Sequence, residues 1–149
     1  MQTPGPDHPI TIRQADGRWR ALFHNAVIAD SANALELQEA SYPPVVYFPK
    51  EDVSLEYAAK TDHRTHCPYK GDASYYTFKR DTEFAENVAW SYEDPNPAVA
   101  QIAGHIAFYP DRVEVYRPLT VDPKEARRQR FQAAGSRIVT RHRPLGRKA

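Results

Sequence analysis

The sequence predicts a mainly β fold. We expect a single compact domain of short antiparallel strands in a tent-like or barrel-like sheet, with two or three short helices and a basic C-terminal tail. The chain has 149 residues, which is enough for one domain. Nine tyrosines, six phenylalanines and two tryptophans favour pleated, half-buried surfaces. Proline, glycine and aspartate separate these β-forming residues into short runs, which is typical of strands joined by turns.

The first predicted element is a hairpin. Residues 10–13 alternate in polarity, and Asp16 and Gly17 supply a turn. Residues 19–23 then return as a second strand. One face of that strand carries Trp19, Ala21 and Phe23.

A helix is predicted after the next apolar run. Residues 26–29 are apolar and lead to Asp30 and Ser31, which are favoured residues at a helix N-terminus. The apolar residues after them, Ala34, Leu35 and Leu37, suggest two or three helical turns that stop before Pro43.

The middle of the chain is predicted to be strand-rich. Residues 45–48 form a dense β-former run, and a turn or helical piece begins at residue 50. Residues 60–71 are interpreted as a loop. Residues 73–79 and 86–92 are predicted strands.

Four further elements complete the prediction. Residues 98–102 are expected to form a short helix. Residues 106–109 and 113–116 flank Pro110 and are predicted to pair as a hairpin. A second short helix is expected over residues 124–134. The domain organisation is then a loose leader (1–8), a folded domain (9–118) and a basic extension (119–149).

Cysteine count and hydropathy bear on location. A single cysteine leaves no internal disulfide, which fits a reducing cytoplasm. No apolar run approaches the ~20 residues of a membrane span. The first residues lack the pattern of a signal peptide. We therefore expect a cytoplasmic protein that has no membrane partner.

Charge is distributed unevenly along the chain. Residues 124–149 hold nine Lys/Arg and one acid, Glu125, whereas the rest holds eleven Lys/Arg and eighteen acids. The tail therefore carries about +8 and the body about −7. A basic arm can bind nucleic acid, but this one contains a single aromatic residue, Phe131, on which a base could stack. We expect no nucleic-acid partner and keep tail-mediated association as an alternative.

The single cysteine lies in the most informative segment, residues 65–71. Cys67 stands between His66 and Lys70, and cations favour the reactive thiolate. The functional interpretation is a nucleophile with His66 or a distant histidine as base. The structural interpretation is a small buried hydrophobic residue beside a turn.

Four ordered segments carry a resemblance to a known family: residues 46–53, 65–76, 87–95 and 102–113. Over about residues 10–117 the chain resembles the bacterial and fungal family called domain of unknown function 427. The resemblance implies a small, mostly β protein with a tent-like arrangement of antiparallel strands. Some domain collections attach a nucleotidyltransferase name to this family. Nucleotidyl transfer needs metal-holding carboxylates near a triphosphate cradle, and no Asp-x-Asp pair or Gly-Ser loop occurs in the region of the resemblance.

Four residues are candidates for catalysis: Cys67, Lys70, Glu93 and Asp52. Lys70 would hold an anionic ligand, or it forms an ion pair with Asp52, Glu93 or Asp94. Glu93 follows an aromatic strand, and burial there would raise its pKa as a general acid requires. Asp52 is the second candidate for acid–base catalysis.

Ligand binding is expected from the aromatic residues of the same segments. Tyrosine hydroxyls need partners, which suggests a pocket with apolar walls and a polar rim; the alternative is core packing. The candidates are Tyr47, Tyr69, Tyr75, Trp90, Tyr92, Phe108 and Tyr109. Metal binding is not expected, because the spacing of His63, His66 and Cys67 is irregular. No cofactor is expected either.

These observations predict an enzyme that acts on a small organic, aromatic or planar, substrate in a pocket around Cys67 and Lys70. Its reaction class stays open between acid–base and thiol chemistry. The alternative is a non-catalytic module for ligand binding or interaction. A homodimer is kept open as a partner.

Overall fold

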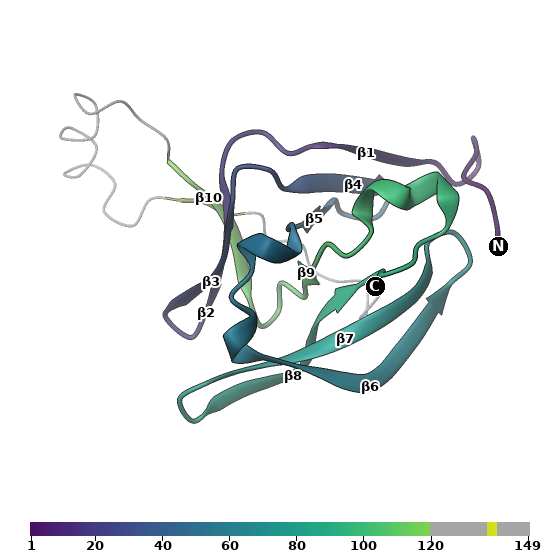
Figure 1. Cartoon of the computed structure of the whole chain (residues 1–149). Helices are drawn as coiled ribbons and strands as arrows, with labels where there is room; N and C mark the ends of the chain where they lie inside the picture. The colour runs from purple at the N-terminus through teal and green to yellow at the C-terminus, as the bar shows by residue number, and fades with distance from the viewer. Residues whose placement is uncertain (120–136, 140–149) are drawn as a thin grey trace.

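Three antiparallel sheets surround one hydrophobic interior (Figure 1). The computed structural model describes residues 1–119 and the backbone of residues 137–139. The predicted mainly β class is confirmed, and within the described part the sheets are open. The helix expected over residues 124–134 lies outside the described residues.

The first sheet has the order β1-β4-β5. It is formed by β1 (Ile10–Gln14), β4 (Leu35–Glu39) and β5 (Val45–Tyr47). The helix predicted after Ser31 is wrong, since β4 occupies its place. The central strand hydrogen-bonds to a neighbour on both edges, and it buries Leu37 and Glu39 with the two-residue period of a strand.

The second sheet has the order β11-β10-β2-β3. Its strands are β2 (Trp19–Phe23), β3 (Ala26–Ser31), β10 (Glu114–Pro118) and β11 (Arg137–Val139). The predicted inward face of β2 is confirmed: Trp19, Ala21 and Phe23 are buried.

The third sheet carries the longest strands and has the order β6-β7-β8-β9. They are β6 (Ala58–Cys67), β7 (Gly71–Arg80), β8 (Glu83–Ser91) and β9 (Ala107–Phe108). The loop predicted over residues 60–71 is wrong up to Cys67. Its polar composition is that of an edge strand, because β6 pairs only with β7 in this sheet and exposes most of its side chains.

Both predicted hairpins are wrong as pairings, although turns occur at the expected places. After Gly17, whose φ of +74° suits glycine, the chain leaves the first sheet and enters the second. After Pro110 it likewise passes from β9 in the third sheet to β10 in the second. In each case the turn connects two sheets.

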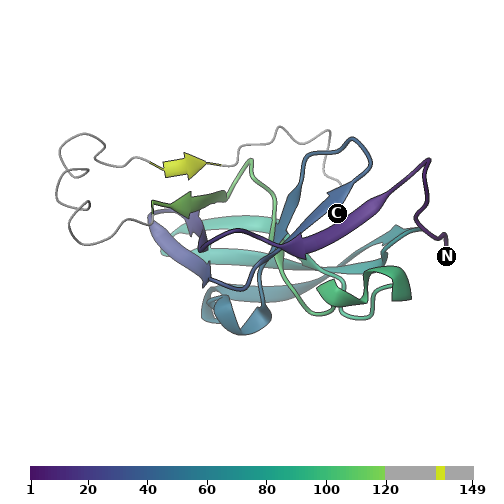
Figure 2. The ribbon, with the colours of Figure 1, turned by 90° about the horizontal axis from the view of Figure 1, so that it is seen from above.

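Three short 3₁₀-helices supply the helical content of the described residues: η1 (Lys50–Asp52), η2 (Leu55–Tyr57) and η3 (Pro97–Ile102). Backbone hydrogen bonds of 2.8 Å in both directions between Phe48 and Ile106 connect the first and third sheets. In the view of Figure 2, β1 and β4 lie over the long strands of the third sheet. The interior between these layers holds Cys67, Lys70 and most of the candidate aromatic residues.

Candidate functional site

A buried ion pair lies between the first and third sheets. Lys70, in the turn between β6 and β7, is 3% exposed, and Glu39, at the end of β4, is 5% exposed. The Lys70 Nζ lies 2.5 Å from Glu39 Oε1. This pairing corrects the expected partners of Lys70, which were Asp52, Glu93 and Asp94. A buried pair loses much of its attraction to desolvation, so it is weak evidence for stability.

The ion pair is linked toward the surface by a histidine. His8 Nε2 lies 2.7 Å from Glu39 Oε2, and the His8 side chain is 22% exposed. The His8 ring stacks on Tyr69, with centroids 3.9 Å apart and planes 9° apart. Ala40 follows Glu39 with a φ of +47°, a conformation that a residue with a Cβ rarely adopts. The backbone beside Glu39 is thus strained where the carboxylate is positioned.

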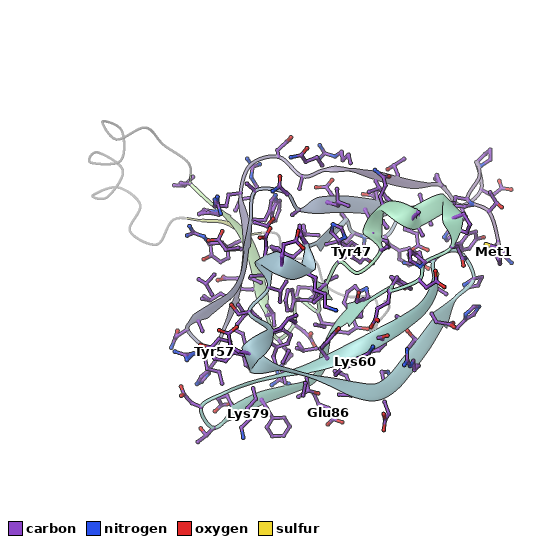
Figure 3. The ribbon with its side chains drawn as sticks, viewed as in Figure 1. Met1, Tyr47, Tyr57, Lys60, Lys79 and Glu86 are labelled. Carbon is purple, nitrogen blue, oxygen red and sulfur yellow. The ribbon has the colours of Figure 1, made fainter. Side chains whose placement is uncertain are left out.

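A network of aromatic side chains lies in the same interior. Trp90 Nε1 donates to Tyr47 Oη at 3.2 Å, and the Trp90 ring packs on Tyr109 at 4.5 Å. The Tyr75 hydroxyl lies 3.4 Å from the Tyr109 hydroxyl and 2.9 Å from Thr65 Oγ1. Figure 3 places Tyr47 in the interior of the molecule. These rings therefore form one connected, hydrogen-bonded group.

Tyr92 is the exception in this group. Its side chain is fully buried, and its hydroxyl has no hydrogen-bond partner among the described residues. The Lys70 Nζ lies 5.7 Å from the centroid of its ring. Burial raises the pKa of Tyr92 far above its usual value, and Tyr47 and Cys67 nearby raise it further. A neutral donor with no acceptor is thus enclosed beside an ion pair.

Tyr47 shares these surroundings. Burial raises the pKa of its hydroxyl, the hydrogen bond from Trp90 opposes that rise, and the nearby Glu39 and Cys67 add to it. Tyr47, Cys67 and Tyr92 belong to one core cluster, and Glu39 is tied to it because Lys70 contacts both Glu39 and the Tyr92 ring. We call this set, with Lys70, the buried centre.

Cys67 belongs to the buried centre, but His66 does not. Cys67 ends β6 and is buried. His66 precedes it on the strand and therefore points to the opposite face, where its Nδ1 lies 2.7 Å from Asp72 Oδ1 and its side chain is 67% exposed. The expectation that His66 serves as the base for Cys67 is wrong for this geometric reason.

Glu93 lies at the surface. Its carboxylate is 2.6 Å from Lys60 Nζ, and its side chain is 42% exposed. The hydrogen bond from Lys60 lowers the pKa of Glu93. A general acid needs the opposite shift, so the expected raised pKa is wrong: a lysine, and not an apolar wall, faces this carboxylate.

Asp52 and Phe108 occupy other surroundings. Asp52, on η1, accepts a hydrogen bond of 2.6 Å from Ser31 Oγ of β3. Phe108 packs edge-on against Phe48 and Phe78, as apolar core. The structure thus brings Cys67 and Lys70 together with Tyr47, Tyr75 and Tyr92. It places Tyr69 against His8, at the side of Glu39.

Sequence reasoning missed Glu39 and His8. Glu39 was not considered because its segment was predicted to be a helix. In a strand, however, Leu35, Leu37 and Glu39 point to the same side, since alternate residues share a face. Nothing local in the sequence singles out His8. Its role depends on contacts of the leader: Gln2 N donates to Pro68 O at 2.8 Å, beside Lys70.

Two features are absent from the described residues. Residues 1–119 contain no group of three or more His, Cys, Asp or Glu side chains arranged to hold a metal ion. No helix in the part of the chain that the structure describes is long and apolar enough to cross a bilayer.

The fold and the buried centre define a small, mainly β domain with a charged and aromatic interior. The chain belongs to the family described as domain of unknown function (DUF427), labelled NTP_transf_9, whose model matches residues 11–118. This confirms the resemblance noted in the sequence.

Similarity to curated proteins is short. The chain is 77% identical over 22 residues to Protein RnfH of Neisseria meningitidis serogroup C (strain 053442) and, to the same extent, to Protein RnfH of Neisseria gonorrhoeae. The matched stretch is 15% of this chain and 24% of each relative. The chain thus spans about a quarter of the length of the curated relatives it matches.

Proposed function

We propose that the buried centre binds a small organic molecule and that the protein acts on it as an acid–base enzyme. The observation that carries the proposal is the Tyr92 hydroxyl, which is enclosed without a partner beside the Lys70–Glu39 pair. A buried donor left unpaired costs about 1–3 kcal/mol. An acceptor atom of a ligand at this hydroxyl would remove that cost.

Lys70 is the proposed proton donor. An ammonium group has three N–H donors, and Glu39 accepts from one of them at 2.5 Å. Glu39 also contacts His8, which reaches the solvent. A proton given up by Lys70 could therefore be replaced through Glu39 and His8, a route that an isolated buried lysine would lack.

The surrounding rings set the class of ligand. Tyr47, Tyr75, Trp90 and Tyr92 offer flat apolar faces with a few polar atoms at their edges. Such walls favour a planar organic molecule that carries an oxygen or nitrogen acceptor. Cys67 adds a small polarizable wall, and its thiol is a second candidate reactive group.

A second candidate function is non-catalytic ligand binding at the same centre. It is favoured because the two expected acid–base groups lie away from Cys67. His66 points outward, and Glu93 is paired with Lys60 at the surface. The two functions differ in turnover and share the ligand.

The test is equilibrium dialysis of the full chain against a small-molecule extract of bacterial cells, with enriched compounds identified by mass spectrometry. We expect enrichment of a planar compound by the wild type and its loss in Tyr92→Phe. Arg13→Gln is the control, because Arg13 lies exposed on β1. Equal retention by wild type and Tyr92→Phe, or no enrichment, contradicts the proposal.

Incubation with the enriched compound separates the two functions. Conversion that is lost in Cys67→Ala while binding persists supports thiol chemistry. Conversion that persists in Cys67→Ala supports acid–base chemistry at Lys70. Binding without any conversion supports the non-catalytic module.

A further inference from the structure

A separate groove lies at the far end of the third sheet, where β7 turns into β8. It is open to solvent and has a volume of about 490 Å³, within the range of small-molecule pockets. Its walls come from η2, the start of β6, the end of β7 and the start of β8. Figure 3 shows Tyr57 and Lys79 at this end of the molecule. None of the candidate residues predicted from the sequence lines it.

One residue of the groove lining, Arg80, carries an unpartnered donor. Arg80 Nε is buried and has no hydrogen-bond partner among the described residues. The Arg80 guanidinium lies over the Tyr57 ring, 6.0 Å from its centroid, which orients the group. An arginine N–H can only donate, so the missing partner is an acceptor. Lys79 also lines the groove, but its side chain is exposed, so water screens its charge.

The groove also has an exposed aromatic wall. Phe84 is 58% exposed, an unusual position for a phenylalanine. Arg112 Nη2 donates to Phe84 O at 3.1 Å and so fixes the backbone at this residue. The wall is therefore held in place while its ring is left uncovered.

The expected charge of the ligand follows from which charged groups of the lining are buried. The acidic residues of the lining, Glu56 and Asp81, are exposed, so water screens their charges. Arg80 Nε is desolvated and unscreened. An anionic acceptor satisfies it best, since hydrogen bonds between charged groups are the stronger ones.

We propose that this groove is a second ligand site, which takes a small planar organic anion with a carboxylate or phosphate at Arg80 and its ring against Phe84. The site is distinct from the buried centre, and neither depends on the other.

The test is an NMR titration of the full chain that follows the Arg80 Nε–H resonance. The probes are benzoate and phenyl phosphate, with benzyl alcohol as the neutral control. We expect saturable shifts with one or both anions and none with the alcohol. Binding of benzoate alone assigns the site to carboxylates, and binding of phenyl phosphate alone assigns it to phosphates. No saturation with either anion, or equal binding of the alcohol, overturns the proposal.

Variants locate the binding. Arg80→Gln is expected to lower the affinity for the anion roughly tenfold to a hundredfold, because a hydrogen bond to a charged group is lost. Phe84→Ser, at an exposed position that tolerates change, is expected to weaken it severalfold. Arg13→Gln alters net charge identically on β1 and should bind as the wild type does. Backbone amide shifts follow binding where Arg80 is absent. Wild-type affinity in either groove variant overturns the proposal.

Discussion

Replacement of Tyr92 by phenylalanine tests the unpartnered hydroxyl directly. The change removes one oxygen from a fully buried ring and leaves its packing in place. Because the hydroxyl has no partner, its removal relieves a desolvation penalty of about 1–3 kcal/mol. The vacated space is smaller than a methyl group, so the cavity it leaves costs less than the penalty removed. We therefore expect Tyr92→Phe to be more stable than the wild type.

The assay is equilibrium unfolding in urea of the ligand-free protein. The midpoint should rise while the slope with denaturant stays unchanged, since the exposed area on unfolding is the same. Tyr47→Phe is the matched control: its hydroxyl accepts from Trp90 Nε1 at 3.2 Å, so its loss strands a buried donor and should destabilise by about 1–3 kcal/mol. A Tyr92→Phe protein that is as destabilised as Tyr47→Phe would show that the Tyr92 hydroxyl has a partner.

Burial raises the pKa of Tyr47 and of Tyr92 in the folded protein, so the stability that each contributes is present below pH ~10 and is lost as the pH rises above it. The free energy of unfolding should then fall by about 1.4 kcal/mol per pH unit for each residue. Tyr92→Phe should roughly halve this fall in urea unfolding at alkaline pH, and an unchanged fall contradicts the prediction. Lys70→Met should destabilise by about 3–5 kcal/mol, and Lys70→Met with Glu39→Leu should recover most of that loss, as thermal unfolding would show; a double variant no better than the single one excludes the ion-pair explanation. Lys60→Gln should raise the pKa of Glu93 toward its usual value, as a carboxyl NMR titration would show, and an unchanged titration would argue against the pairing. The effect on stability should be less than about 1 kcal/mol because the pair is exposed. The stability that Glu93 contributes is present at neutral pH and is lost on acidification. A tail variant replaces four cations with glutamine: Arg141, Arg143, Arg147 and Lys148. It is preferable to truncation because β11 pairs with β10, and it should leave any weak RNA binding and the salt dependence of that binding unchanged. A weaker salt dependence in the variant would instead support the tail as a nucleic-acid arm.

The sequence revealed strands better than it revealed their partners. Trp19, Ala21 and Phe23 carry the two-residue period on a single strand, so their shared face was predictable. The pairing of β1 with β4 and of β2 with β10 joins segments far apart in the chain, and no local pattern records it. Short turns at Gly17 and Pro110 suggested hairpins because the sequence does not show that each turn leads into another sheet.

The part of the site that lies within the family's sequence motifs was predictable. Cys67, Lys70, Tyr47 and Tyr92 were expected near one another, and the electrostatic contacts of the tyrosines are consistent with that expectation. The expected general acid, Glu93, was misjudged because Lys60 on the exposed strand β6 was interpreted as part of a loop. The partner of Lys70 was unpredictable as long as residues around Glu39 were assigned to a helix.

In the proposed function, the buried centre holds a small organic molecule at the Tyr92 hydroxyl. Non-denaturing mass spectrometry of the full chain, after exposure to a small-molecule extract, measures this most directly. A single added organic mass on the wild type and its absence from Tyr92→Phe is the predicted result. The bare chain mass for both proteins, or the same adduct on both, would contradict binding at this hydroxyl.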